Sequence, residues 1–196
     1  MPTWQFFLKR SLDIAVSATM LILLSPLYLF AAIKVKLSSK GPIFFQQERL
    51  GKGGHPFMIF KFRSMRLDAE DAGPQLSKDD DPRVTPWGKI MRKYRIDEIP
   101  QFYNVLIGDM SLVGPRPERQ FYIDQIVDKA PNWKQLLRVR PGITSWGQVK
   151  YGYASNIEEM VQRLKYDILY IESMSLSLDV TIMLHTVLVL IKGKGK

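Results

Sequence analysis

The chain contains no cysteine and only two histidines among its 196 residues. The lack of cysteine excludes a disulfide framework, a cysteine-based zinc site and a thiol nucleophile, and it suits a reducing cytoplasm. With His55 and His185 alone, a histidine-rich metal site is not expected. A bound metal should therefore be a hard cation held by carboxylate and phosphate oxygens.

Acidic residues are also in short supply, because 19 Asp and Glu stand against 28 Lys and Arg, giving a net charge of +9. A basic chain favours an anionic partner, and nucleic acid, an anionic membrane surface and a phosphorylated substrate all fit that sign. The length suits one domain with room for an appendage.

Charged residues are missing altogether from residues 14–33. A run of about 20 apolar residues is long enough to cross a bilayer. However, Ser25 and Pro26 interrupt it, and an interior proline removes a backbone hydrogen bond and kinks a helix.

Cations lie on both sides of this run, with Lys9 and Arg10 before it and Lys34 after it. A spanning helix usually has its cations at the cytoplasmic end only. We therefore predict a re-entrant membrane hairpin in residues 1–40 and a cytosolic domain in residues 41–196. A straight span and a buried helix of a soluble protein are the alternatives.

Residues 43–51 and 56–65 have the pattern of two strands joined by a glycine-rich turn. In the second strand Phe60 and Phe62 alternate with Lys61 and Arg63, which predicts one apolar and one cationic face. Two cations on one face could hold phosphate, and a half-exposed edge strand kept soluble by charge is nearly as good an explanation.

Residues 67–82 form a polar, acidic stretch that predicts a loop. Asp79 and Asp81 have the Asp-x-Asp spacing with which nucleotide-sugar glycosyltransferases hold a metal. A solvated acidic run is the favoured interpretation of this stretch.

Asp97 and Glu98 follow a run of cations and precede Pro100. Proline is tolerated in the first turn of a helix, so a helix is predicted to begin at Pro100, to continue through Ile107 and to end at Gly108. Neighbouring side chains point in different directions, so the two acids should have different roles. Taken alone, two solvated acids at a helix start are the commoner explanation.

Arg116 stands between Pro115 and Pro117, which restrict its backbone. A guanidinium held in place suits bidentate phosphate recognition. Further helices are predicted by apolar periodicity at residues 87–94, 121–127, 157–172 and 176–191. The last of these is expected to lie on or dock against a membrane as an amphipathic helix.

These segments, in this order, resemble the bacterial sugar transferases, also called monotopic phosphoglycosyl transferases. The resemblance covers nearly the whole chain. It rests on residues 9–13 (KRSLD), 25–26 (SP), 41–44 (GPIF), 47–51 (QERLG), 61–65 (KFRSM), 97–101 (DEIPQ), 104–106 (NVL), 108–111 (GDMS), 114–117 (GPRP) and 140–144 (RPGIT).

The resemblance implies a mostly helical α+β fold, in which a re-entrant helix-break-helix carries a small cytosolic α/β domain with interfacial amphipathic helices. It implies Mg2+-dependent transfer of a sugar 1-phosphate from a UDP-sugar to polyprenyl (undecaprenyl) phosphate. The implied location is the cytoplasmic face of the bacterial inner membrane. The implied partners are the nucleotide sugar, the lipid phosphate and phospholipid, not nucleic acid, and a homodimer remains open.

The resemblance also assigns roles to residues. Asp97 would be the nucleophile and metal ligand, with Glu98 as its support. Arg116 would be the principal phosphate clamp, and three further cations would assist it: Lys61, Arg63 and Arg140. The family's larger members carry extra segments ahead of this core, so the chain is expected to be a minimal form, and residues 146–155 resemble the exopolysaccharide branch most.

Three alternatives stay open at this stage. A non-covalent transferase would use Asp97 or Glu98 as a metal ligand or base. A metal-dependent glycosyltransferase would use Asp79 and Asp81. A non-catalytic scaffold of a polysaccharide assembly complex would use none of these residues.

Overall fold

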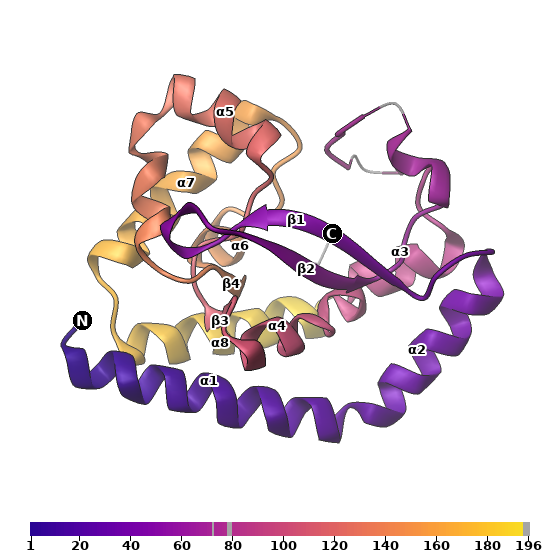
Figure 1. The fold of residues 1–196 in the computed structure, drawn as a ribbon, viewed down its shortest axis with the longest axis horizontal. Helices are drawn as coiled ribbons and strands as arrows, with labels where there is room; N and C mark the ends of the chain where they lie inside the picture. Colours follow the sequence, from indigo (N-terminus) through magenta and orange to yellow (C-terminus); the bar gives the residue numbers. More distant parts are fainter. Residues whose placement is uncertain (72, 78–79, 194–196) are drawn as a thin grey trace.

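The structure is a computed structural model that describes residues 1–71, 73–77 and 80–193. Helices dominate it, and the described part has two sheets of two strands each (Figure 1). Strands β1 (Phe44–Leu50) and β2 (Pro56–Phe62) pair antiparallel, whereas β3 (Ser111–Val113) and β4 (Gly142–Thr144) pair parallel. The predicted mostly helical α+β class is confirmed.

Two helices, α1 (Thr3–Leu23) and α2 (Ser25–Ser38), open the chain and bend by 62° where they meet. Pro26 lies in the first turn of α2, where its missing N–H and fixed φ are tolerated. In the described ranges no single helix has the length and hydropathy of a membrane span, but this bent pair together does. The break predicted at Ser25 and Pro26 is thus found. Helix α1 begins at Thr3, ahead of the apolar run of residues 14–33.

Lys9 and Arg10 lie inside α1 and contact the rest of the domain. The ammonium of Lys9 donates to Asp179 at 2.7 Å, and the guanidinium of Arg10 donates to the Val105 carbonyl at 2.7 Å. The sequence interpretation placed both residues as cations flanking a hairpin. The structure adds that one side of α1 is polar and packs on α4 (Gln101–Ile107), β3 and α8 (Leu176–Ile191).

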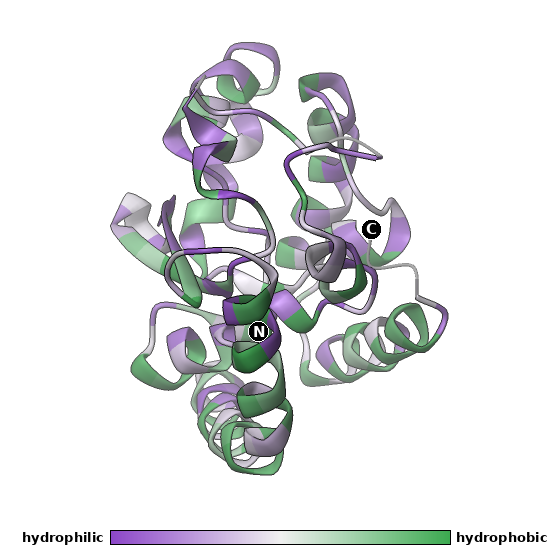
Figure 2. Cartoon of the chain, turned by 90° about the vertical axis from the view of Figure 1, so that its right-hand side faces the viewer, coloured by the Kyte–Doolittle hydropathy of each residue, from purple (hydrophilic) through white to green (hydrophobic). Residues whose placement is uncertain are grey.

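The opposite side of these helices is apolar and exposed. Hydrophobic residues colour the helices in the lower part of Figure 2, whereas the upper part is mixed. In α1 and α2 the exposed large residues include Ile22, Leu23 and Leu37, and in α8 they include Leu184 and Ile191. Many large exposed apolar residues on neighbouring helices are typical of an interaction face.

The β1–β2 hairpin turns through η1 (Lys52–Gly54), where Gly53 has a φ of 71° that favours glycine. The register pairs Gln47 with Ile59 and Phe45 with Lys61. Phe62 is buried with Val35 of α2, so the β-hairpin is packed against α2. Both predicted strands and their turn are confirmed.

Helix α3 (Pro86–Lys93) begins at a Thr85 cap whose hydroxyl accepts from Gly88 N at 2.9 Å. It leads through η3 (Ile96–Glu98) into α4, which Gly108 ends with a φ of 105°. The predicted helix from Pro100 to Gly108 is confirmed, with Pro100 as the residue before the first full turn.

The remaining helices form a second hydrophobic cluster on the side away from α1 (Figure 1). They are α5 (Gln120–Lys129), η4 (Pro131–Arg138) and α7 (Ile157–Glu172), while the short α6 (Trp146–Lys150) joins β4 to them. α7 and α8 have the bounds that periodicity predicted. In its described part, the loop predicted at residues 67–82 contains the short helix η2 (Leu67–Glu70).

Candidate active site

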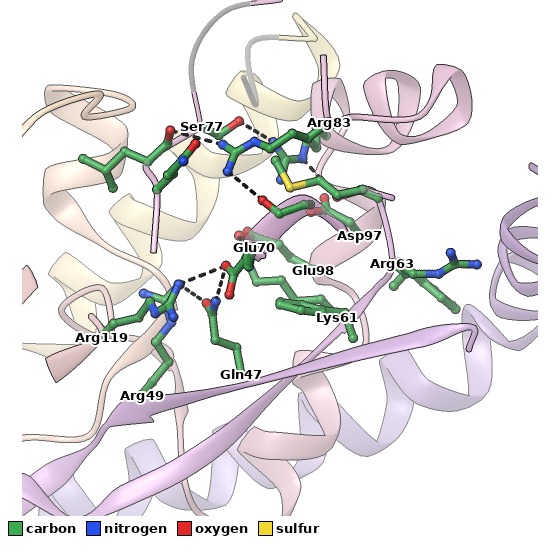
Figure 3. Close-up of a pocket in the computed structure, with 18 of the residues that line it drawn as sticks. Gln47, Arg49, Lys61, Arg63, Glu70, Ser77, Arg83, Asp97, Glu98 and Arg119 are labelled. Carbon is green, nitrogen blue, oxygen red and sulfur yellow. Dashed lines mark hydrogen bonds and ion pairs between the residues drawn. The ribbon is translucent and has the colours of Figure 1, made fainter. Parts of the chain in front are cut away.

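A cavity of about 260 Å3 lies beside β2, η3 and the segment that follows β3. Its described wall carries ten Lys and Arg side chains and four carboxylates, so it favours a ligand with several negative charges. Five of the predicted site residues line it: Lys61, Arg63, Asp97, Glu98 and Arg116. Figure 3 shows the two acids on one turn beside Lys61. Arg140 does not line this cavity.

The two adjacent acids sit on a tight turn that begins at Arg95. Arg95 has a φ of 53°, a left-handed conformation that is costly for a residue with a side chain. The turn leaves Asp97 and Glu98 only 6% and 7% exposed. The alternative of two solvated acids is therefore wrong, and the strained backbone of Arg95 lies beside two buried carboxylates.

Glu98 is surrounded by cations. Its Oε1 accepts from Lys61 Nζ at 3.1 Å and lies 3.5 Å from Arg116, and its Oε2 accepts from Arg95 Nε at 2.7 Å. Within the described ranges Asp97 makes no ion pair or hydrogen bond through its carboxylate. The two neighbours thus have different environments, as the sequence predicted.

These environments move the two pKa values in opposite directions. Burial raises the pKa of Asp97, and the neighbouring charge of Glu98 raises it further, against the attraction of Lys61. Burial would also raise the pKa of Glu98, but Arg95, Lys61 and Arg116 outweigh it and lower that pKa well below its usual value. Glu98 is therefore ionised at neutral pH, and Asp97 is the carboxylate open to a reaction partner.

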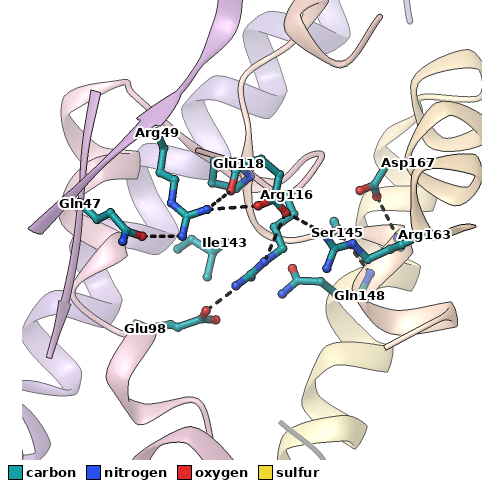
Figure 4. A network of polar contacts seen from close by, with 12 residues as sticks. Gln47, Arg49, Glu98, Arg116, Glu118, Ile143, Ser145, Gln148, Arg163 and Asp167 are labelled. Carbon is teal, nitrogen blue, oxygen red and sulfur yellow. Dashed lines mark hydrogen bonds and ion pairs between the residues drawn. The ribbon is translucent and has the colours of Figure 1, made fainter. Parts of the chain in front are cut away.

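Arg116 is held by a second buried carboxylate, Glu118 (Figure 4). Glu118 lies 4.0 Å from Arg116 and accepts from Arg163 of α7 at 2.6 Å and from Arg49 of β1 at 3.2 Å. The Arg116 guanidinium thus lies between Glu118 and Glu98, and these two contacts fix its position. The described wall of the cavity still has more cations than carboxylates.

Asp167, four residues after Arg163 in α7, holds the same segment through the backbone. Its carboxylate accepts from the amides of Gly147 and Arg116. Gly147 must be glycine here, because a Cβ would lie 2.7 Å from the Arg163 side chain. Sequence reasoning missed this support, although an Arg and an Asp at i and i+4 within an apolar helix were a visible signal.

The guanidinium groups of two predicted phosphate ligands are engaged away from the two acids, although Arg63 contributes to the cavity wall. The Arg63 guanidinium donates to three backbone carbonyls after α2, those of Ser39, Lys40 and Pro42. Figure 3 shows it apart from the acids. Arg140 donates to the Gly108 carbonyl at 2.8 Å. Among the predicted cations, Lys61 and Arg116 are the two whose charged groups reach Glu98.

The other end of the cavity has a polar group that sequence reasoning did not single out. Glu70 of η2 accepts from Gln47 of β1 and from Arg119, both at 2.9 Å. Arg49 donates to the Gln47 amide oxygen at 2.6 Å. These contacts tie η2, in the loop after β2, to β1 and to Arg119 in the wall of the cavity.

Magnesium fits this donor set only together with a substrate. No group of three or more His, Asp or Glu in the described part could hold a metal by itself. Asp97 offers one free carboxylate, and Mg2+ is commonly bound by one or two carboxylates plus substrate phosphates. Asp81 is engaged by Arg83 at 2.6 Å, which keeps its pKa below the usual range, and Asp79 lies outside the described residues.

Comparison with known proteins places this geometry in context. The family model described as "Bacterial sugar transferase" matches residues 4–193. The chain is 46% identical, over 96% of its length, to an Aeromonas hydrophila protein named UDP-N-acetylgalactosamine-undecaprenyl-phosphate N-acetylgalactosaminephosphotransferase, and it covers 45% of that protein.

Two further relatives carry the name UDP-glucose:undecaprenyl-phosphate glucose-1-phosphate transferase. The Escherichia coli protein is 40% identical over 92% of the chain, which covers 39% of it. The Caulobacter vibrioides protein is 42% identical over 91% of the chain, which covers 68% of it. The chain thus spans less than half of the first two relatives.

Proposed function

Because the chain belongs to the bacterial sugar transferase family, we propose that it moves a sugar 1-phosphate from a UDP-sugar to undecaprenyl phosphate or another polyprenyl phosphate. The relatives' names support this donor and acceptor. The observation that carries the proposal is the buried pair of acids, in which three cations engage Glu98 and leave the Asp97 carboxylate available.

The reaction follows from that availability. An Asp97 oxygen attacks the phosphorus that bears the sugar, and a bond forms between the carboxylate and that phosphorus. The bond to the bridging oxygen breaks, and the nucleoside monophosphate leaves with the electron pair. A phosphate oxygen of the polyprenyl phosphate then attacks the same phosphorus, which releases the Asp97 carboxylate and yields the polyprenyl diphosphate sugar.

The surrounding residues reduce the repulsion between a carboxylate and an anionic diphosphate. Lys61 and Arg116 are held on one side by Glu98 and point their remaining donors at the cavity. A bound Mg2+ would be held by Asp97 and the diphosphate, and it would neutralise charge on the phosphoryl oxygens. Glu98 acts as the organiser of these cations, because its own oxygens are engaged.

The hairpin provides the place for the lipid acceptor. We infer that α1 and α2 insert part-way into the membrane and return to its cytoplasmic face. Tyr28 of α2 donates its hydroxyl to the carbonyl of Ile99, the residue after Glu98. This direct contact would keep the acids at the level where a lipid phosphate resides, which supports an enzyme at the membrane surface.

The covalent route predicts release of nucleoside monophosphate from the donor alone. Protein reconstituted in membranes without polyprenyl phosphate should release UMP in an amount about equal to the protein, and its mass should rise by one sugar phosphate. Chromatography of quenched-flow samples measures the UMP released, and intact-mass spectrometry measures the mass of the protein. UMP that appears only with both substrates present would favour the non-covalent alternative, and UDP as product would favour a glycosyltransferase.

The hairpin predicts that both of its ends face the same side. The absence of native cysteine makes labelling specific, so Thr3→Cys and Lys40→Cys, both exposed positions, should react with a membrane-impermeant maleimide from the cytoplasmic side only. Lys165→Cys, exposed on α7, reports the side of the catalytic domain. Labelling of the first two positions from opposite sides would contradict the hairpin.

A further inference from the structure

A second, smaller cavity of about 60 Å3 lies between α1 and the body of the domain. Phe6 and Arg10 line it from the helix, and Lys52, Arg138 and Arg140 line it from the domain. It shares no lining residue with the cavity of Asp97. Its chemistry is therefore not explained by the proposed phosphoryl transfer.

The charges around this cavity are unbalanced. Five cations and one carboxylate, Asp13, line it in the described part. Lys9 is paired with Asp179, and Asp13 accepts from the Leu112 amide at 3.1 Å. This leaves four cations that form no ion pair with a described residue: Arg10, Lys52, Arg138 and Arg140.

Backbone carbonyls compensate two of these cations only partly. Arg10 donates to Val105 and Leu106, and Arg140 donates to Gly108, all at the end of α4. A helix C-terminus carries only about half a negative charge, less than either guanidinium. Burial and the charge of Arg140 both disfavour the charge of Arg10, and Asp13 offsets only part of this effect. An anion between them would relieve this repulsion.

The surroundings identify the kind of anion. Trp4, Phe6 and Phe7 of the same turn of α1 are large and at least 45% exposed. Aromatic residues beside cations are typical of the interface between lipid headgroups and acyl chains. A free phosphate would share the charge chemistry but would leave the aromatic side chains unexplained.

We propose that this cavity binds the phosphodiester headgroup of an anionic phospholipid, held by Arg10, Arg138 and Arg140 with an acyl chain along Phe6. The lipid would fix α1 at a defined depth beside the domain. The inference rests on the membrane insertion of α1 and α2 given under the proposed function. It assigns Arg140 to a structural lipid and not to the substrate.

The test is flotation of the whole protein with vesicles. Binding to vesicles of equal parts phosphatidylcholine and phosphatidylglycerol should be tighter than binding to phosphatidylcholine alone. Replacing Arg138 and Arg140 by Gln should weaken binding to the vesicles that contain phosphatidylglycerol about 10- to 30-fold, as expected for two cations near an anionic surface. Binding to vesicles of phosphatidylcholine alone should be unchanged. Arg138→Gln alone should give part of this loss, and it breaks no hydrogen bond or ion pair among the described residues.

The matched control is Lys134→Gln with Lys165→Gln, which removes the same charge from exposed positions on η4 and α7. An equal loss of vesicle binding in this control, or equal binding of the unchanged protein to both kinds of vesicle, would overturn the lipid site. Neither result would affect the proposed insertion of α1 and α2 into the membrane. Selective competition by inorganic phosphate, against chloride at equal ionic strength, would assign the cavity to free phosphate. Failure of the protein to bind either kind of vesicle would overturn the proposed insertion of α1 and α2 into the membrane.

Discussion

Replacing Asp97 by Asn is expected to abolish sugar phosphate transfer and at the same time to stabilise the protein. Loss of a nucleophile that acts in a covalent mechanism typically lowers kcat by about 10⁴-fold or more. The amide cannot form the phosphosugar intermediate, so UMP release from donor alone should vanish too. Transfer into the lipid fraction of a reconstituted membrane measures the first effect.

The stability gain follows from the raised pKa of Asp97. Burial and the charge of Glu98 make the ionised carboxylate costly in the folded protein, and each pKa unit of such a shift corresponds to about 1.4 kcal/mol. Above the folded pKa the wild-type protein carries this full cost, and Asn does not. Below the unfolded pKa the carboxyl group is neutral in both states, so the advantage of Asn should disappear there.

Thermal unfolding of both proteins across pH tests this sign, with the four tryptophans as the fluorescent probe. The Tm of Asp97→Asn should exceed that of wild type at neutral pH, and the difference should shrink as the solution is made acidic. The transfer activity of wild type should fall on the acid side at a higher pH than an ordinary aspartate would give. A lower Tm for the Asn variant at neutral pH would contradict the unpaired environment of Asp97.

Replacing Glu98 by Gln should have the opposite effect on stability. The change leaves Lys61, Arg95 and Arg116 without their shared anion in a buried site. Removing one partner of a buried ion pair costs about 3–5 kcal/mol. For a chain of this size that corresponds to a fall in Tm of roughly 6–20 °C, at about 2–4 °C per kcal/mol. Activity should fall as well, because Lys61 and Arg116 lose their fixed positions.

The pH dependence of this loss also has a defined sign. The pKa of Glu98 is lowered by its cations, so its stabilisation is present above the unfolded pKa and is lost as pH falls towards the folded one. The gap between wild type and Glu98→Gln should therefore narrow in acid. Glu172→Gln, an exposed glutamate at the end of α7, is the control for removal of one negative charge. A Tm loss in Glu98→Gln no greater than in this control would rule out Glu98 as the organiser of the cations.

Local sequence signals determined much of the secondary structure. The Ser25–Pro26 break, the turn at Gly53, the helix ended by Gly108 and the two C-terminal helices were all predicted within a few residues. Each depends on a backbone preference or an apolar period that a short stretch expresses by itself. The same signals could not show that α1 has a polar side, because the partner of Lys9 lies 170 residues away.

The sequence by itself also singled out Asp97, Glu98, Lys61 and Arg116, which line one cavity. Only the tertiary structure decided the environment of each side chain. A carboxylate or guanidinium has the same composition wherever it lies, and its pKa and availability depend on burial and on charges from distant segments. Arg63 and Arg140 were both candidate phosphate ligands in the sequence. In the structure the Arg63 guanidinium donates to backbone carbonyls, and Arg140 lines the second cavity. Glu98 and Asp97 are adjacent, and only the three cations around one of them made the other the free carboxylate.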